Sequence, residues 1–141
     1  MAHPENRYIQ KINRLLRPLK QQHRFYYAKI QMAGNNGWPD CYYSGPGGDL
    51  WAEYKYISDR EFPKKSDTNI TVKLSKNQQQ WIAGRHQEGR NVCVIVGSPH
   101  GSVLLRWPIP KTISRADFIQ YAVEDNQIAQ YIKKEVMKND D

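Results

Sequence analysis

Cysteine is scarce in this chain, as are the features that mark secreted or membrane proteins. The 141 residues include two cysteines, Cys41 and Cys93, which are too few for a disulfide framework and form no CxxC pair. No apolar run approaches the roughly 18–20 residues of a membrane span. The first residues, Met-Ala-His-Pro-Glu, lack the apolar stretch of a signal peptide. We therefore expect a cytoplasmic protein with reduced thiols and no membrane partner.

The sequence also lacks internal repeats, low-complexity tracts and linkers. Its length suits one domain, since domains most often run to roughly 100–150 residues. Hydrophobic residues make up 39% and aromatic residues 11%, which is enough for a packed core. We expect a single domain over 1–141, with a core at about 3–107 and a helical region at about 112–138.

Acidic residues are absent between Asn6 and Pro39, and the net charge of the chain is +7. That segment and a second basic stretch supply the candidate DNA contacts, which are Lys11, Arg14, Lys29, Lys64, Lys65, Lys73 and Lys76. Such a surface would neutralise phosphates and release counterions, which favours a nucleic-acid partner. A solvated basic face that only keeps the protein soluble is the alternative.

Hydrophobic periodicity and turn signals predict an α/β or α+β order: a helix, a three-stranded meander, a helix, further strands and C-terminal helices. We expect helices at about 3–17 (ended or kinked at Pro18), 75–88 and, broken near Asp125, 114–138; strands at about 24–32, 40–44, 50–57, 91–97 and 102–107; and a loop at 58–71. A capping box at Ser75 and Gln78 marks the start of the second helix.

Three charged residues carry the strongest chemical signal. Side chains at i and i+2 of a strand share a face, so Glu53 and Lys55 project together. A hairpin with its turn at 45–49 brings Asp40 beside them. Two carboxylates and an ammonium on one patch are costly unless they are paired or bound to metal. Such oxygen ligands suit Mg²⁺, with Mn²⁺ as a substitute, while the lysine would orient or deprotonate a water.

This pattern resembles the PD-(D/E)XK nuclease superfamily, with Pro39-Asp40 as its first half and Glu53-x-Lys55 as its second. It is more closely similar to the stand-alone VRR-NUC family, on Gly37-x-Pro39-Asp40, Glu53-x-Lys55 and Leu74-Ser75-x-x-Gln78 before Trp81. The resemblance covers about residues 3–97. It implies a restriction-endonuclease-like fold in which Asp40, Glu53 and the backbone carbonyl of Tyr54 hold the metal.

The resemblance also implies active-site roles for Glu5 and Gln78. Periodicity supports Glu5 independently, because Tyr8, Ile9 and Ile12 place it on the inward stripe of its helix. Each site residue has a structural alternative. Asp40 could cap a turn, Glu53 and Lys55 could form a solvated pair, Glu5 could favour the helix dipole, and Gln78 could serve only the capping box.

By resemblance, the chain is expected to be a magnesium-dependent endonuclease that cuts branched DNA such as four-way junctions, leaves a 5′-phosphate and acts as a dimer. A bacteriophage source would fit a compact nuclease of this kind. The alternatives are a catalytically idle nucleic-acid-binding module and a nuclease for other DNA or RNA. The apolar stripe of the C-terminal helices (Phe118, Ile119, Ile128, Ile132 and Val136) either closes the core or makes the dimer, and we favour the dimer.

Overall fold

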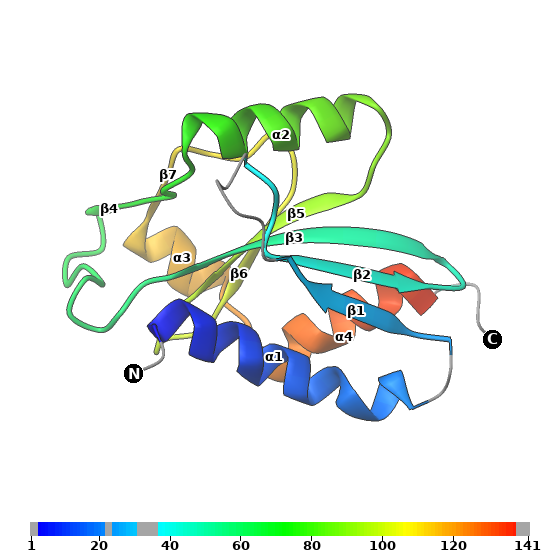
Figure 1. Ribbon diagram of the computed structural model, residues 1–141. Helices are drawn as coiled ribbons and strands as arrows, with labels where there is room; N and C mark the ends of the chain where they lie inside the picture. Colours follow the sequence, from blue (N-terminus) through cyan, green and yellow to red (C-terminus); the bar gives the residue numbers. More distant parts are fainter. Residues whose placement is uncertain (1–2, 22–23, 31–36, 138–141) are drawn as a thin grey trace.

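The computed structural model describes residues 3–21, 24–30 and 37–137, and these form an α/β fold of mixed sheet and helices (Figure 1). In chain order the elements are α1 (Pro4–Lys20), β1 (Tyr26–Lys29), β2 (Cys41–Gly45), β3 (Gly48–Tyr56), β4 (Asn69–Thr71), α2 (Lys76–Gln87), β5 (Val92–Gly97), β6 (Val103–Leu105), β7 (Thr112–Ser114), α3 (Arg115–Tyr121) and α4 (Asp125–Met137). The helix, the three-stranded meander and the second helix follow in the expected order.

A five-stranded sheet in the order β1-β2-β3-β5-β6 forms the centre of the fold. The β1–β2, β2–β3 and β5–β6 pairs are antiparallel, whereas β3 and β5 are parallel. Helix α2 makes the crossover between the parallel strands. All six residues of β5 are buried, as the continuous apolar run at 91–97 predicts.

Helices cover the two faces of this sheet unequally (Figure 1). On one face, α1 and α4 pack on β2 and β3 around a core that includes Ile12, Tyr43, Leu50 and Ile132. On the other face, α2 and α3 enclose a second cluster over β5 and β6. Strands β1 and β2 therefore lie at the side of the sheet where only one face is covered by helices.

Two expectations about secondary structure need correction. Helix α1 continues through Pro18 to Lys20, because Pro18 lies in its last turn and the burial of Leu19 holds that turn on the core. The expected loop at 58–71 ends in strand β4, which pairs with β7. Three-residue strands with one buried side chain carry too little periodicity to be recognised in a sequence. Part of the expected strand at 24–32 lies outside the described residues.

The expectation that the C-terminal apolar stripe forms a dimer interface is wrong for most of its residues. Ile128, Ile132 and Val136 are buried in the core between α4, α1 and the sheet, and Phe118 of α3 is buried in the second cluster. Ile119 alone of this stripe is exposed. The stripe therefore closes the core of its own chain. In the described ranges, no helix combines the length and apolar character needed to cross a membrane.

Candidate active site

The β2–β3 hairpin brings Asp40 back to the Glu53–Lys55 segment. In its register Cys41 pairs with Ala52, so the preceding Asp40 lies beside the next residue of β3, Glu53. One carboxylate oxygen of Asp40, Oδ2, accepts a 2.9 Å hydrogen bond from the backbone N–H of Tyr54. Pairing across the hairpin thus makes neighbours of two acids that are thirteen positions apart.

The carboxyl group of Glu53 lies in the interior of the protein. Its side chain is 2% exposed, and its Oε1 has no hydrogen-bond partner among the described residues. Burial raises the pKa of Glu53 to about 8, the Asp40 carboxylate adds to this rise, and Lys55 opposes it. A buried oxygen without a partner is costly in a structural role. Its presence beside a second acid indicates a site for a cation or a proton.

Lys55 and Gln78 complete the polar surroundings of Glu53. The ammonium of Lys55 lies 3.2 Å from Oε2 of Glu53, and it donates a 3.2 Å hydrogen bond to Oε1 of Gln78. The side-chain amide of Gln78 donates to the same Oε2 of Glu53 at 2.8 Å. Lys55 and Gln78 therefore hold one oxygen of Glu53 and leave the other available.

The expected capping box of α2 is present and determines which way the Gln78 amide points. The Ser75 hydroxyl accepts from the backbone N–H of Gln78 at 3.1 Å, and Oε1 of Gln78 accepts from the backbone N–H of Ser75 at 2.9 Å. Since Oε1 is held by Ser75, the amide nitrogen must point toward Glu53. The capping contacts of Gln78 and its hydrogen bond to Glu53 are thus compatible, and one supports the other.

The loop before β2 rests directly on the start of α2. Gly37 has a φ of +86°, and a Cβ at this position would lie 2.3 Å from the carbonyl oxygen of Asn77. Only glycine fits so close an approach with a positive φ. The contact places Trp38, Pro39 and Asp40 beside the helix end that carries Gln78.

Glu5 reaches the same site from the first turn of α1. Burial raises the pKa of Glu5, the negative charge of Asp40 adds to the rise, and Lys55 opposes it. Burial also raises the pKa of Asp40, against the hydrogen bond from Tyr54 and the charge of Lys55. Glu5 and Lys55 line a cavity of about 410 Å³ that runs from the site to β4. Three acids and one lysine therefore share one electrostatic neighbourhood.

A divalent cation fits Asp40 and Glu53 only with help from a main-chain oxygen or water. Across the described ranges, no group of three or more His, Cys, Asp and Glu side chains is arranged to hold a metal ion. The residues that could hold one are Asp40, through its carboxylate, Glu53, through the unpaired Oε1, and Tyr54, through its backbone carbonyl. Hard oxygen donors of this kind suit Mg²⁺ or Mn²⁺.

The expected DNA-contact residues divide into those near the site and those away from it. Lys29 donates a 3.0 Å hydrogen bond to Asn6, and its positive charge opposes the rise in the pKa of both Glu5 and Asp40. Lys73 lines the cavity that Glu5 and Lys55 share, 3.9 Å from Glu61. Neither Asn6 nor Glu61 was recognised in the sequence, because nothing in their local pattern distinguishes them from solvated polar residues.

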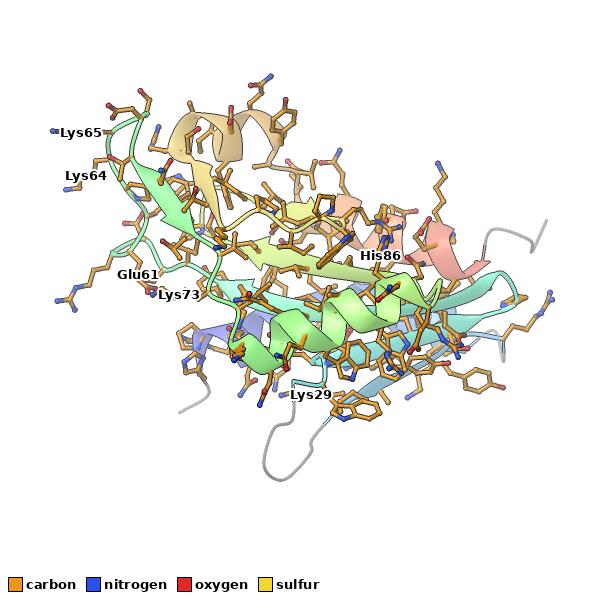
Figure 2. All side chains as sticks on the ribbon, turned by 90° about the horizontal axis from the view of Figure 1, so that it is seen from above. Lys29, Glu61, Lys64, Lys65, Lys73 and His86 are labelled. Carbon is orange, nitrogen blue, oxygen red and sulfur yellow. The ribbon has the colours of Figure 1, made fainter. Side chains whose placement is uncertain are left out.

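The remaining cations lie farther out. Lys64 and Lys65 are exposed on the loop between β3 and β4 and point away from the body of the protein (Figure 2). Lys76 is exposed at the start of α2, and Arg14 is exposed on α1 about 13 Å along the helix axis from Glu5. Lys11 forms a 2.8 Å ion pair with Asp125, so its charge is already partly neutralised.

Comparison with known proteins agrees on the fold. No protein-family model matches the sequence, and no curated protein matches it. The chain is similar to the solved structure of Hjc from Archaeoglobus fulgidus, a Holliday junction resolvase from an archaeal hyperthermophile. The TM-score is 0.50 and the identity 15%, over 85% of this chain and 98% of that one. A solved VRR_NUC domain matches with a TM-score of 0.44 and 24% identity, over 69% of this chain and 87% of the domain. The expected restriction-endonuclease-like fold is thus confirmed: the chain has the fold of that resolvase.

Proposed function

We propose that this chain is a metal-dependent DNA endonuclease that hydrolyses phosphodiester bonds. The observation that carries the proposal is the convergence of Asp40, Glu53 and Lys55 on one site, with Oε1 of Glu53 buried and without a partner. If Glu53 and Lys55 formed only a solvated pair on an exposed face, the side chain of Glu53 would be exposed, whereas it is 2% exposed. The fold likeness to a resolvase is consistent with this chemistry but does not carry it.

Asp40, Glu53 and the carbonyl of Tyr54 would hold Mg²⁺ or Mn²⁺, with Glu5 nearby. When bound, the ion would supply positive charge for the scissile phosphate and favour ionisation of the attacking water. The protein's own contribution is to fix the carboxylates. Tyr54 holds Asp40 through its backbone N–H, and Gln78 holds Glu53 through its side-chain amide.

Lys55 would act on the attacking water. An ammonium has three N–H donors, so Lys55 can contact Glu53 and Gln78 and still donate to a water or a phosphate oxygen. The two fixed contacts keep its nitrogen beside the carboxylates, where a water attacking the phosphate would lie. It would also stabilise negative charge that develops on the phosphate.

Branched DNA is the substrate that we favour, with cleavage leaving a 5′-phosphate. This choice follows from the VRR-NUC-like motif and from the resolvase activity of the structural neighbour, which belongs to that protein. The exposed lysines of the β3–β4 loop and Lys29 would contact phosphates on either side of the site. The alternatives are an idle nucleic-acid-binding module of the same fold and a nuclease for other DNA or RNA.

The test is cleavage of an end-labelled four-way junction, a flap, a linear duplex and a single strand, with Mg²⁺, Mn²⁺ or EDTA. Wild-type protein is compared with Lys55→Ala and with Lys133→Ala, which removes an exposed lysine from α4. We expect metal-dependent junction cutting that Lys55→Ala abolishes and Lys133→Ala retains. Tight binding of the junction without cutting under either metal would instead establish the idle module.

A further inference from the structure

The segment that follows β3 is held on the fold by the first residues of α3. We call this segment, residues 58–71, the arm; it ends in β4, which pairs with β7. The carbonyl of Thr68 accepts a 2.9 Å hydrogen bond from the backbone N–H of Arg115, and the carbonyl of Ser66 accepts a 3.0 Å bond from that of Ala116. The first N–H groups of a helix have no partner within the helix. Here the arm provides the partners.

The side chain of Arg115 adds a contact with another part of the arm. Its Nε donates a 2.9 Å hydrogen bond to the carbonyl of Pro63, and its guanidinium carbon lies 5.7 Å from the centre of the Phe62 ring. Phe62 is buried and packs edge to face on Phe118 of α3, with ring centroids 5.3 Å apart. Arg115 therefore joins the buried beginning of the arm to its exposed middle part.

The part of the arm that Arg115 holds lies between the candidate active site and the solvent. Pro63 and Thr68 line the cavity of about 410 Å³ that Lys55 also lines. Between them, Lys64 and Lys65 are exposed and point away from the body of the protein (Figure 2). The arm is thus a wall of the active-site cavity and also carries two of the candidate DNA contacts.

The arm contains as many acids as cations. These are Asp59, Glu61 and Asp67 against Arg60, Lys64 and Lys65. Asp59 lies 3.2 Å from the His100 ring, and Glu61 accepts hydrogen bonds from the backbone and the hydroxyl group of Ser58, so two of the acids have partners near the start of the arm. A loose segment without net charge would gain little from phosphates. The placement of the two outward lysines therefore matters more than the charge of the arm.

We propose that Arg115 is a positioning residue for DNA binding, which fixes the arm so that Lys64 and Lys65 contact the phosphates of DNA bound at the active site. A fixed arm presents its lysines without the entropic cost of ordering a loop on binding. Arg115 acts through these lysines and not through a DNA contact of its own. This role rests on the proposed nuclease function, whereas the contacts that hold the arm do not.

A double-mutant cycle separates action through the lysines from a direct contact. Binding of a fluorescently labelled four-way junction is measured in EDTA, so that no cleavage is needed. We expect Arg115→Ala to weaken binding by about 3–10-fold in wild-type protein and to have almost no further effect in Lys64→Ala/Lys65→Ala. An equal loss in both backgrounds, or no loss in either, overturns the proposal.

The control for loss of a positive charge is Arg90→Ala. Arg90 is exposed and precedes β5, at the end of the parallel strand pair remote from the arm. We expect its replacement to have the same effect on binding whether Lys64 and Lys65 are present or not. Lysine-dependent weakening by Arg90→Ala as large as that by Arg115→Ala would show that the coupling is not specific to the arm, and would overturn the proposal.

Cleavage kinetics provide a second readout that a general loss of structure would not mimic. Arg115→Ala should raise KM and leave kcat unchanged, because Glu53 and Lys55 keep their contacts with each other and with Gln78. A fall in kcat at unchanged KM overturns the positioning role. Junction binding without cutting by wild-type protein would overturn the nuclease proposal alone, since the binding cycle still tests Arg115. Wild-type protein that binds no DNA would overturn both.

Hydrogen exchange covers the case in which Arg115→Ala fails to fold. Arg115→Met keeps an unbranched side chain beside Phe62 and removes the donor to Pro63. We expect the backbone amides of Arg115 and Ala116 to be protected in wild-type protein, because the arm accepts from both, and to exchange faster in Arg115→Met. Unprotected amides in wild-type protein, or equal protection in the two proteins, would show that the Arg115 side chain does not hold the arm and overturn the proposal.

Discussion

The side-chain amide of Gln78 donates a 2.8 Å hydrogen bond to Oε2 of Glu53, joining the first turn of α2 to the middle of the central sheet. Gln78 is also the reciprocal member of the capping box with Ser75. One side chain therefore begins a helix and orients a buried carboxylate. This double role connects the stability of α2 to the geometry of the candidate active site.

Replacing Gln78 should affect both properties. We expect Gln78→Ala to lower cleavage by about 10–100-fold, the usual effect of losing a group that orients a ligand. Loss of the capping contacts should lower the free energy of unfolding by about 1 kcal/mol. Gln80→Ala, at an exposed position of the same helix, is the control. Cleavage rates and denaturant unfolding measure the two effects. A Gln78→Ala protein that cleaves at the wild-type rate would show that Glu53 does not need the hydrogen bond from Gln78.

Glu53 should be a residue that lowers the stability of the metal-free protein. We expect Glu53→Gln to abolish cleavage and, in EDTA near neutral pH, to raise the free energy of unfolding by on the order of 1–2 kcal/mol. The reason is that burial beside Asp40 raises the pKa of Glu53 to about 8, so that near neutral pH folding requires this carboxyl to take up a proton, whereas an amide is neutral in both states.

The pH dependence of this gain provides a check on its cause. The folded-state pKa of Glu53 is raised to about 8, so the wild-type protein loses stability as the pH rises from about 4.5 through 8. The advantage of Glu53→Gln should shrink toward pH 4.5 and vanish below it, where the wild-type carboxyl is protonated in both states. Glu88→Gln, at an exposed ion pair, should change stability little at any pH. A Glu53→Gln protein less stable than wild type in EDTA would contradict the cost of the buried charge.

The lysines of the β3–β4 loop should contribute to DNA affinity without contributing to the chemical step. In the Lys64→Ala/Lys65→Ala variant, binding should weaken, and the slope of log affinity against log salt should fall by about 1 for each phosphate contact that is lost. Cleavage at saturating DNA should be unchanged. The matched control is Lys133→Ala/Lys134→Ala, two exposed neighbours on α4. Equal salt slopes for both double variants would remove this loop from the DNA surface.

Replacing either of two glycines by alanine should change the stability of the protein in opposite directions: Gly37, which contacts the start of α2, and Gly84, which lies within α2. Gly37→Ala forces a Cβ to within 2.3 Å of the Asn77 carbonyl at a positive φ. We therefore expect the free energy of unfolding to fall by about 1–3 kcal/mol and cleavage to be reduced.

Gly84 lies inside α2, and a Cβ added there would meet open space. Gly84→Ala should therefore raise the free energy of unfolding by about 0.5–1 kcal/mol. Thermal unfolding measures both changes. A Gly37→Ala protein as stable as wild type would show that the loop can leave α2 at little cost.

The central part of the site was predictable from the sequence because it depends on short-range rules. Alternation along a strand places Glu53 and Lys55 together, and the Gly/Pro turn predicted at 45–49 folds Asp40 back to them. The Ser75–Gln78 spacing identified the capping box that the structure contains. These relationships hold within one hairpin or one helix turn, so local periodicity and turn chemistry are enough to specify them.

The tertiary structure decided which of these groups meet across the fold. No local pattern shows that the Gln78 amide reaches Glu53 or that Oε1 of Glu53 has no partner. Nor does one show that the α4 stripe is buried against α1 while Trp38, Trp51 and Trp81 remain partly exposed. An apolar stripe has the same sequence pattern whether it faces a core or a partner, because periodicity defines a face and not what covers it. The sequence by itself therefore determined which charged groups form the candidate site, and the packing of segments distant in the chain decided the electrostatics of that site and which surfaces stay open.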